Sequence, residues 1–125
     1  MRTIKFRGKD KKTGEWFYGN FFDKDTSGRT HICTTKKGCL DIDPDTVGQF
    51  TGLKDKNDND IYEGDIVAFV FKGKVVRSEV AWNEETAMFF FKPQFTHLFT
   101  SMFAPKFTII GNIHDNKELL KGNMK

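Results

Sequence analysis

Two carboxylates, Glu63 and Asp65, stand two residues apart in the segment Ile61-Tyr62-Glu63-Gly64-Asp65. Side chains at this spacing share one face of a β-strand, and two carboxylates on one face can transfer protons or hold a metal ion. In the structural alternative, Gly64 forms a turn or bulge and Asp65 accepts backbone hydrogen bonds there. We favour the structural interpretation, because Gly-Asp followed by β-branched residues opens strands in SH3-like barrels generally.

His31, Cys33 and Cys39 form the pattern H-x-C-x5-C, which contains side chains that bind zinc. A zinc site needs three or four such ligands, and the other histidines, His97 and His114, lie far along the chain. A Cys33 nucleophile assisted by His31 would need a third, orienting group that nothing in the sequence marks. We expect both cysteines to be unpaired, because a reducing compartment disfavours structural disulfides.

The segment from Asp55 to Asp60 resembles the start of an EF-hand calcium loop. The sixth position of such a loop requires Gly and the twelfth a bidentate Glu, whereas this chain has Asp60 and Ile66 there. The flanking segments also read as strands rather than helices. The sequence therefore predicts a solvated hairpin turn, in which residues 57–59 tolerate left-handed φ angles.

Aromatic residues are concentrated between positions 16 and 22, near Lys11, Lys12 and Arg29. Such a cluster can stack the bases of single-stranded nucleic acid, although strand alternation puts only half of it on one face, and that half is more often core. A second group of cations flanks a predicted hairpin tip and could contact phosphates, although such tips are more often merely solvated. The candidate binding residues are therefore Trp16, Tyr18, Lys72, Lys74 and Arg77.

The charge of the chain is nearly balanced: 20 basic and 17 acidic residues are interleaved and give a net charge of +3. A dedicated nucleic-acid-binding protein usually shows a stronger basic excess, so nucleic acid is a partner that we do not favour. No Gly-rich phosphate loop, nucleophile elbow or metalloprotease motif occurs in the sequence. We therefore expect no catalytic residue, no cofactor and no bound metal ion.

Short β-prone segments alternate with turn signals about every ten residues, which predicts a mainly β antiparallel barrel or sandwich with SH3-like elements. Asp43-Pro44-Asp45-Thr46 is a type I turn signature. At 125 residues we expect one domain, with two small β subdomains, about 1–42 and 43–125, as an alternative. The sequence indicates about eight strands, over residues 3–7, 15–22, 29–34, 47–53, 66–71, 75–82, 88–91 and 107–113.

One segment near 94–103 has the period of an amphipathic helix. Its apolar residues are Phe95, Leu98, Phe99, Met102 and Phe103. This face packs either on the core or against another subunit. The chain has 14 phenylalanines, and more aromatic residues than one small core requires would form an exposed patch of the kind that marks an interface. We therefore expect a homo-oligomer.

Four segments, in order along nearly the whole chain, resemble those of the YopX family of small phage and prophage proteins. Gly8-Lys9 departs from the family's usual Ala-Trp, Asp58 stands at a turn position that is usually Gly, and Lys117 replaces a common Pro. These departures affect turns and one strand end, so they do not change the expected fold. The matching segments are Ile4–Arg7, Asp43–Asn57, Ile61–Val67, and Ile109–Ile113 with Asn116, Glu118 and Leu119.

The resemblance implies a mostly-β fold, a phage or prophage origin and a tendency to self-associate, and it transfers no catalytic residue. We expect a non-enzymatic accessory protein that binds a host or phage macromolecule, for example a protein. The alternatives are a nucleic-acid-binding SH3-like barrel and a counter-defence protein that sequesters a small nucleotide signal. The residues expected to hold turns or the core of the motif are Gly48, Gly52, Tyr62, Gly64 and Asp65.

Membrane association is not expected from the sequence. The start, Met1–Lys5, is not followed by the apolar segment of a signal peptide. The longest apolar runs, such as residues 66–71, are too short to span a bilayer. We expect the protein in the cytoplasm of the bacterial host.

Overall fold

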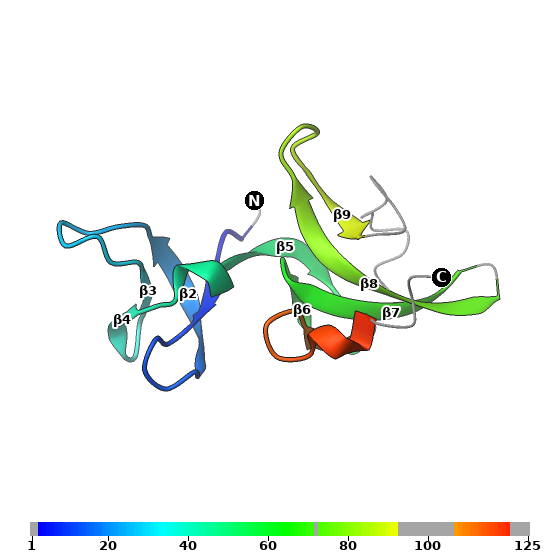
Figure 1. Cartoon of the computed structure of the whole chain (residues 1–125), viewed down its shortest axis with the longest axis horizontal. Coiled ribbons are helices and arrows are strands. Elements are labelled where there is room, and N and C mark those ends of the chain that lie inside the picture. The colour runs from blue at the N-terminus through cyan, green and yellow to red at the C-terminus, as the bar shows by residue number, and fades with distance from the viewer. Residues whose placement is uncertain (1–2, 72, 93–106, 121–125) are drawn as a thin grey trace. The chain divides into compact units, whose positions relative to one another are not determined.

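The computed structural model describes residues 3–71, 73–92 and 107–120 (Figure 1). These residues form ten β-strands and two 3-10 helices, and all the strand pairs are antiparallel. The predicted mainly β, antiparallel fold is confirmed, and neither sheet closes into a barrel over the described strands. The prediction of eight strands was too low, because two hairpins add the short strands β4 and β6. The predicted helix near 94–103 lies outside the described residues.

The chain divides into two compact units, residues 1–50 and residues 51–125. The boundary falls after Phe50 rather than after residue 42, where the two-subdomain alternative had it. Strand β5 (Gly48–Lys54) begins in the first unit and ends in the second. Within the described residues, no helix is both long enough and apolar enough to cross a membrane.

The first unit is a sheet with the strand order β4-β3-β2-β1-β5. Its core contains the fully buried side chains of Ile32 and Ile42. Gly8 lies against them so closely that an added Cβ would come within 2.5 Å of Ile42 Cγ2, so a side chain at this position would require Ile42 to shift. Its strands are β1 (Phe6–Lys9), β2 (Trp16–Phe22), β3 (His31–Thr34) and β4 (Gly38–Asp41).

The predicted turn at Asp43 forms the 3-10 helix η1 (Pro44–Thr46). Asp43 Oδ1 accepts a hydrogen bond from the Asp45 N–H at 3.1 Å, as expected of an Asp that caps a turn. The Thr46 hydroxyl accepts a hydrogen bond from the Lys9 N–H at 2.9 Å. This bond joins the end of β1 to a turn 37 residues later in the sequence.

The second unit contains β6 (Asp60–Tyr62), which follows β5 in its sheet, and a separate four-stranded sheet with the order β10-β7-β8-β9. Its core cluster includes Val67, Val80, Phe91 and Phe107, and the rings of Phe91 and Phe107 are 4.9 Å apart. The strands of the four-stranded sheet are β7 (Asp65–Phe71), β8 (Lys74–Asn83), β9 (Met88–Lys92) and β10 (Thr108–Asn112), and the 3-10 helix η3 (Lys117–Leu120) follows them.

Strands β7 and β8 continue as a two-stranded ribbon beyond the rest of this sheet (Figure 1). The pairing of β7 with β10 ends at Ala68, and the pairing of β8 with β9 ends at Glu79. On the ribbon, Val70 and Val75 pair directly and are 65% and 69% exposed. The ribbon therefore presents an apolar cross-strand pair to solvent.

Candidate functional site

Cations and aromatic rings alternate on one face of the first unit. The register pairs Arg7 with Tyr18 and Lys9 with Trp16, so these four side chains share a face of β1 and β2. The Arg7 guanidinium carbon lies 4.7 Å from the centroid of the Trp16 ring, and Lys9 Nζ lies 5.6 Å from it. Both distances are within the range of a cation–π contact. The rings of Trp16 and Tyr18 therefore lie beside the positive charges of Arg7 and Lys9.

A groove of about 470 Å³ lies at this end of β2. It is lined by Lys5, by residues 16–20 of β2 and by residues 33–37 around the β3–β4 turn. The register explains its position: β2 pairs with β3 only from Asn20 to Phe22, so β3 does not cover the part of β2 that precedes Asn20.

Gly19 of β2 is one of the residues that line the groove. A Cβ at this position would overlap the carbonyl oxygen of Cys33, so only glycine allows β3 to approach β2 this closely.

The lining of the groove is basic and aromatic. Among its described residues, three are lysines and none is an Asp or Glu. Lys37 Nζ lies 5.1 Å from the centroid of the Phe17 ring, and the Lys37 N–H donates to Thr34 Oγ1 at 2.9 Å. Tyr18 is 51% exposed. The arrangement can bind a negatively charged group beside a flat, stacked one.

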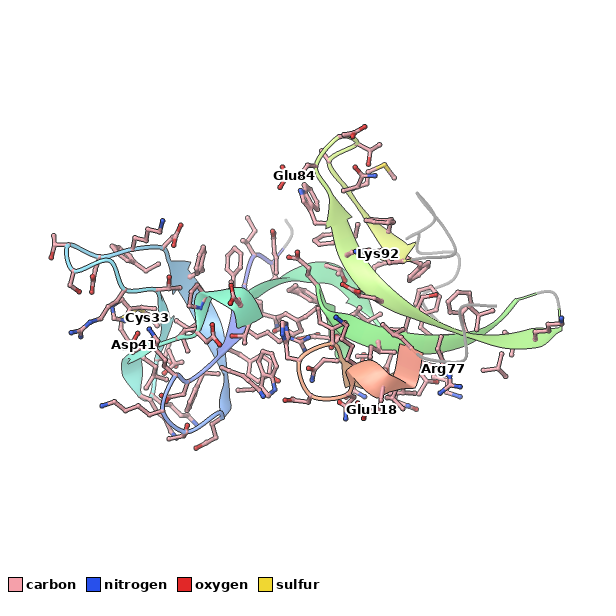
Figure 2. All side chains as sticks on the ribbon, viewed as in Figure 1. Cys33, Asp41, Arg77, Glu84, Lys92 and Glu118 are labelled. Carbon is pink, nitrogen blue, oxygen red and sulfur yellow. A yellow bond between two sulfur atoms is a disulfide. The ribbon has the colours of Figure 1, made fainter. Side chains whose placement is uncertain are left out.

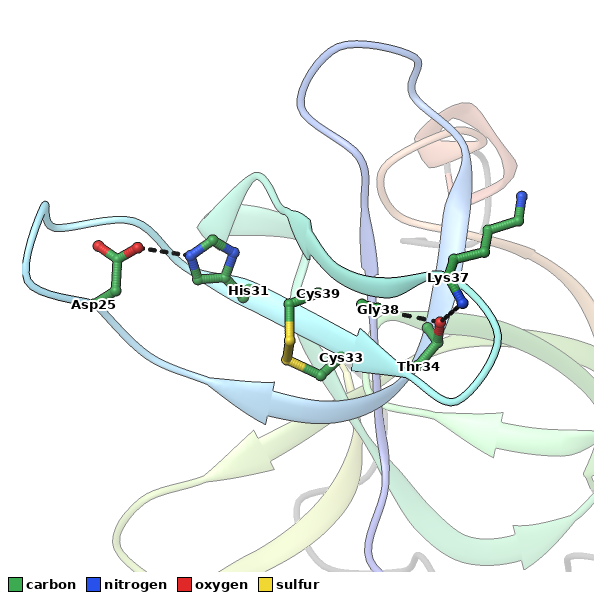
Figure 3. Close-up of a disulfide and its surroundings, with 7 residues drawn as sticks. All are labelled: Asp25, His31, Cys33, Thr34, Lys37, Gly38 and Cys39. Carbon is green, nitrogen blue, oxygen red and sulfur yellow. Dashed lines mark hydrogen bonds and ion pairs between the residues drawn. A yellow bond between two sulfur atoms is a disulfide. The ribbon is translucent and has the colours of Figure 1, made fainter.

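Cys33 and Cys39 form a disulfide bond (Figure 3). The expectation that they are unpaired was wrong. The register of β3 and β4 places the two residues directly opposite each other, with Cα atoms 3.9 Å apart. The expectation rested on the redox state of a compartment and could not take this pairing into account.

The sulfurs of the H-x-C-x5-C pattern are therefore bonded to each other rather than free to bind a metal. No group of three potential metal ligands occurs among the described residues. His114 belongs to the second unit, whereas His31, Cys33 and Cys39 belong to the first. His97 lies outside the described residues.

His31 contacts Asp25 instead of a thiol: its Nε2 lies 2.8 Å from Asp25 Oδ2 (Figure 3). Asp25 Oδ1 accepts hydrogen bonds from the Ser27 hydroxyl at 2.6 Å and from the Arg29 N–H at 3.0 Å. Hydrogen bonds from the Ser27 hydroxyl, the His31 ring and the Arg29 backbone hold the pKa of Asp25 well below its ordinary value. The pair stabilises the turn between β2 and β3.

The Asp65 side chain accepts a hydrogen bond from the backbone of its own turn. Its side chain is fully buried, and its Oδ2 accepts a hydrogen bond from the Tyr62 N–H at 2.7 Å. Gly64, between Glu63 and Asp65, has a φ of 95°, a conformation that favours glycine. The Gly64 N–H donates to the carbonyl of Val80 at 2.8 Å. These contacts agree with the structural interpretation, in which Gly64 forms a turn or bulge and Asp65 accepts backbone hydrogen bonds.

Asp55 has a similar role in the turn that resembles a calcium loop. Its Oδ1 accepts the N–H groups of Asn57 and Asn59, both at 2.9 Å, and its Oδ2 accepts the Ile109 N–H at 3.1 Å. Burial acts to raise the pKa of Asp55, but the hydrogen bonds from Asn59, Ile109 and Asn57 outweigh it, so the pKa lies below its ordinary value. Asp58 has a φ of 67°, in the left-handed region expected for this turn.

The sequence profile described as YopX protein matches residues 5–121 of the chain. The chain belongs to the YopX family. This confirms the resemblance seen in the sequence, and the match includes every residue that lines the groove.

One solved structure similar to this YopX chain is the crystal structure of protein EF1440 from Enterococcus faecalis. The two chains are 26% identical, the match covers 97% of this chain and 100% of that one, and the TM-score is 0.63. No curated protein matches the chain. The similarity therefore supports the YopX fold along almost the whole chain and carries no stated activity with it.

The structure distributes the predicted binding residues over two places in the YopX fold. Trp16 and Tyr18 line the groove of the first unit. Lys74 and Arg77 are on β8 in the second unit, where Figure 2 labels Arg77. Their odd spacing puts them on opposite faces of that strand. Lys72 lies outside the described residues. The predicted set is therefore not a single site within either unit.

The predicted glycines of the YopX motif differ in their surroundings. Gly48 is buried and pairs with Arg7 at the start of β5. Gly52 is exposed and has a φ of 91°, and no neighbouring atom lies near the position of an added Cβ. Gly52 is therefore set by its backbone conformation rather than by close packing.

The sequence analysis missed the cations of the candidate site. Lys5, Arg7 and Lys9 occupy every second position of the first strand, which places them on one face, and this alternation was visible in the sequence. Lys36 and Lys37 precede Gly38 and have the sequence context of a turn, which indicates no neighbouring strand. Only the pairing of β2 with β3 shows that this turn borders the aromatic strand.

Proposed function

We propose that this YopX protein is a non-enzymatic accessory protein of a phage or prophage, acting in the cytoplasm of the bacterial host, where the Cys33–Cys39 bond is subject to reduction. It self-associates and binds a host or phage macromolecule, and it acts by occupying that partner rather than by converting it. The observation that supports binding is the groove of the first unit, which is lined by the exposed ring of Tyr18, two half-buried rings and three lysines. Such a surface is suited to recognition, because aromatic residues are enriched where proteins bind partners and a cluster of lysines attracts negatively charged groups.

The carboxylates that could have supported catalysis have other roles. Asp65 accepts a backbone hydrogen bond in a tight turn, Asp55 accepts three, and Asp25 holds the β2–β3 turn. These side chains stabilise the fold and lie outside the groove lining. Binding is therefore the activity that the geometry supports best.

The ribbon of β7 and β8 supports self-association. Val70 and Val75 form an exposed apolar pair on a segment where β7 and β8 pair only with each other among the described strands. A two-stranded hairpin alone is marginally stable in water. Covering this pair with a second copy would bury the apolar surface and stabilise the ribbon.

Light scattering tests the self-association. We expect a discrete mass above the 14.4 kDa of one chain. The double variant Val70→Ser, Val75→Ser should shift this mass toward the monomer, because it removes the apolar contact. Ile4→Ser is the matched control, because Ile4 is similarly exposed, at 55%, but lies outside the ribbon. A monomeric wild-type protein would contradict this part of the proposal.

Photo-cross-linking tests the groove as the binding site. A photoreactive amino acid replaces Tyr18 in the groove or, as a control, Phe22, which is on the same strand and 56% exposed. Irradiation in the bacterial host should give macromolecular adducts from position 18 in excess of those from position 22. Equal adducts from the two positions would contradict the groove as the site.

A further inference from the structure

The groove has the charge distribution of a site for an anion. Its described lining contains Lys5, Lys36 and Lys37 and no carboxylate, although the chain as a whole carries 17 acidic residues. Arg7 and Lys9 add two further cations on the same face as Lys5. This local excess is much greater than the net charge of +3 implies. A phosphate-rich ligand would be complementary to it.

The rings of the groove supply a second kind of contact. Trp16, Phe17 and Tyr18 all line the groove, and alternation along β2 puts Trp16 and Tyr18 on one face of the strand and Phe17 on the other. Bases stack on such rings with little dependence on sequence. A simple polyanion, such as polyphosphate, would pair with the lysines but has no base to stack on the rings.

The shape of the groove favours a nucleic-acid chain over a free nucleotide. Small-molecule sites usually enclose most of their ligand, whereas here Tyr18 is half exposed and Lys36 is exposed. A nucleic-acid strand can therefore enter and leave the groove along the protein surface. The bases of a duplex are paired and stacked on each other, so only unpaired bases can reach rings that line a groove.

We infer that the groove binds single-stranded nucleic acid, with an unpaired base stacked on Tyr18 and with phosphates paired to Lys5, Lys36 and Lys37. This inference rests on the proposed binding function and names the ligand of the same site. It places the nucleic-acid contact in the first unit, whereas the hairpin residues Lys74 and Arg77 belong to the second unit.

Fluorescence anisotropy with a labelled short oligothymidylate tests the inference on the full-length protein. Tyr18→Ala should weaken binding about tenfold, because it removes one stacking surface, whereas Tyr18→Phe should keep most of the affinity. Phe22→Ala is the matched control: the side chain is on the same strand and exposed, but it is not part of the groove lining. Circular dichroism shows whether each variant is folded.

The lysines are tested by the salt dependence of the same binding. Lys36→Ala together with Lys37→Ala should weaken binding and reduce the slope of log K against log salt by about 0.7 for each phosphate that the variant no longer neutralises. Lys11→Ala together with Lys12→Ala removes the same charge from an exposed turn of the same unit. This control should leave the slope close to that of the wild type.

Competition decides the ligand class. The inference is overturned if oligothymidylate does not bind, or if polyphosphate, duplex DNA or an acidic peptide competes as well as the single strand while Tyr18→Ala has no effect. Its failure can be distinguished from failure of the proposed function by the cross-linking from position 18. Adducts that resist nuclease and yield peptides of a second protein by mass spectrometry would retain a binding function with a protein partner, and absence of any excess adduct would remove both.

Discussion

Asp55 illustrates how a single carboxylate can carry a structural role that its sequence context disguises. Its segment resembles a metal-binding loop, yet the side chain is 5% exposed and accepts three backbone N–H groups. Two of these donors belong to its own turn and the third belongs to Ile109, 54 residues away. Asp55 therefore joins the β5–β6 turn to β10 within the second unit.

Replacing Asp55 with Ala should lower the free energy of unfolding by about 2–4 kcal/mol, because three part-buried N–H donors lose a charged acceptor. Urea unfolding followed by circular dichroism measures this change. Asp58→Ala is not a matched control, since Asp58 has a positive φ. Asn57→Ala is suitable, because Asn57 is exposed and the variant keeps the backbone N–H that donates to Asp55. An effect of Asp55→Ala no larger than that of Asn57→Ala would contradict the structural role.

The same hydrogen bonds predict a pH dependence. The pKa of Asp55 in the folded protein lies below its ordinary value, so the charged carboxylate stabilises the folded state above the unfolded pKa of about 4. This contribution disappears as the pH falls through the folded-state pKa. The stability difference between the wild type and Asp55→Asn should therefore shrink between neutral and strongly acidic pH. A difference that stays constant over this range would rule out the carboxylate as its source.

At the scale of the secondary-structure elements, the β3–β4 hairpin links the disulfide to the groove. Cys33 is both a partner in the disulfide and a residue of the groove lining, and residues 35–37 form the turn between β3 and β4. The disulfide restricts the ends of the segment that carries Lys36 and Lys37. Its redox state is therefore expected to affect both the stability of the hairpin and the position of the two lysines.

Reducing the disulfide should lower the free energy of unfolding by about 2 kcal/mol, as the chain-entropy treatment gives for a short closed loop. Urea unfolding with and without dithiothreitol measures the change. The double variant Cys33→Ser, Cys39→Ser serves as the control, because it should match the reduced wild type and should not respond to the reductant. A wild-type protein that is equally stable with and without the reductant would contradict the prediction.

At the scale of the whole molecule, the two compact units differ in the amount of apolar surface that they bury. In the described ranges, three apolar residues are buried in the first unit (Ile32, Ile42 and Phe50), whereas eight are buried in the second. Full burial of one such side chain contributes about 1.5–3 kcal/mol. The second unit is therefore expected to be the more stable of the two.

Hydrogen exchange measured by mass spectrometry tests this difference. Backbone amides of β7 and β8 should exchange more slowly than those of β2 and β3, because local opening requires less apolar exposure in the first unit. Peptides that cover Val67 and Val80 report on the second unit, and peptides that cover Ile32 report on the first. Equal protection of the two groups, disappearing in one cooperative step, would show instead that the chain unfolds as a single unit.

The sequence by itself determined the mainly β class, most strand positions, the Asp43 turn and membership of the YopX family. These features depend on local signals: alternation of side chains, turn residues at fixed offsets and a motif that spans the chain. The predicted strand over 75–82 corresponds to β8 at Lys74–Asn83, because its β-prone residues and the preceding glycine turn are contiguous. The left-handed φ of Asp58 was predicted from the sequence for the same reason, because it depends on the residues of the turn itself.

Only the tertiary structure decided which strands pair and in what register. The Cys33–Cys39 bond depends on the register of β3 with β4, and the groove depends on β2 pairing with β3 only from Asn20 onward. Asp55 contacts Ile109 across 54 residues. A shift of one residue in register would move every side chain of a strand to the other face. Such pairing is set by the balance of packing over the whole unit, so local sequence patterns do not contain it.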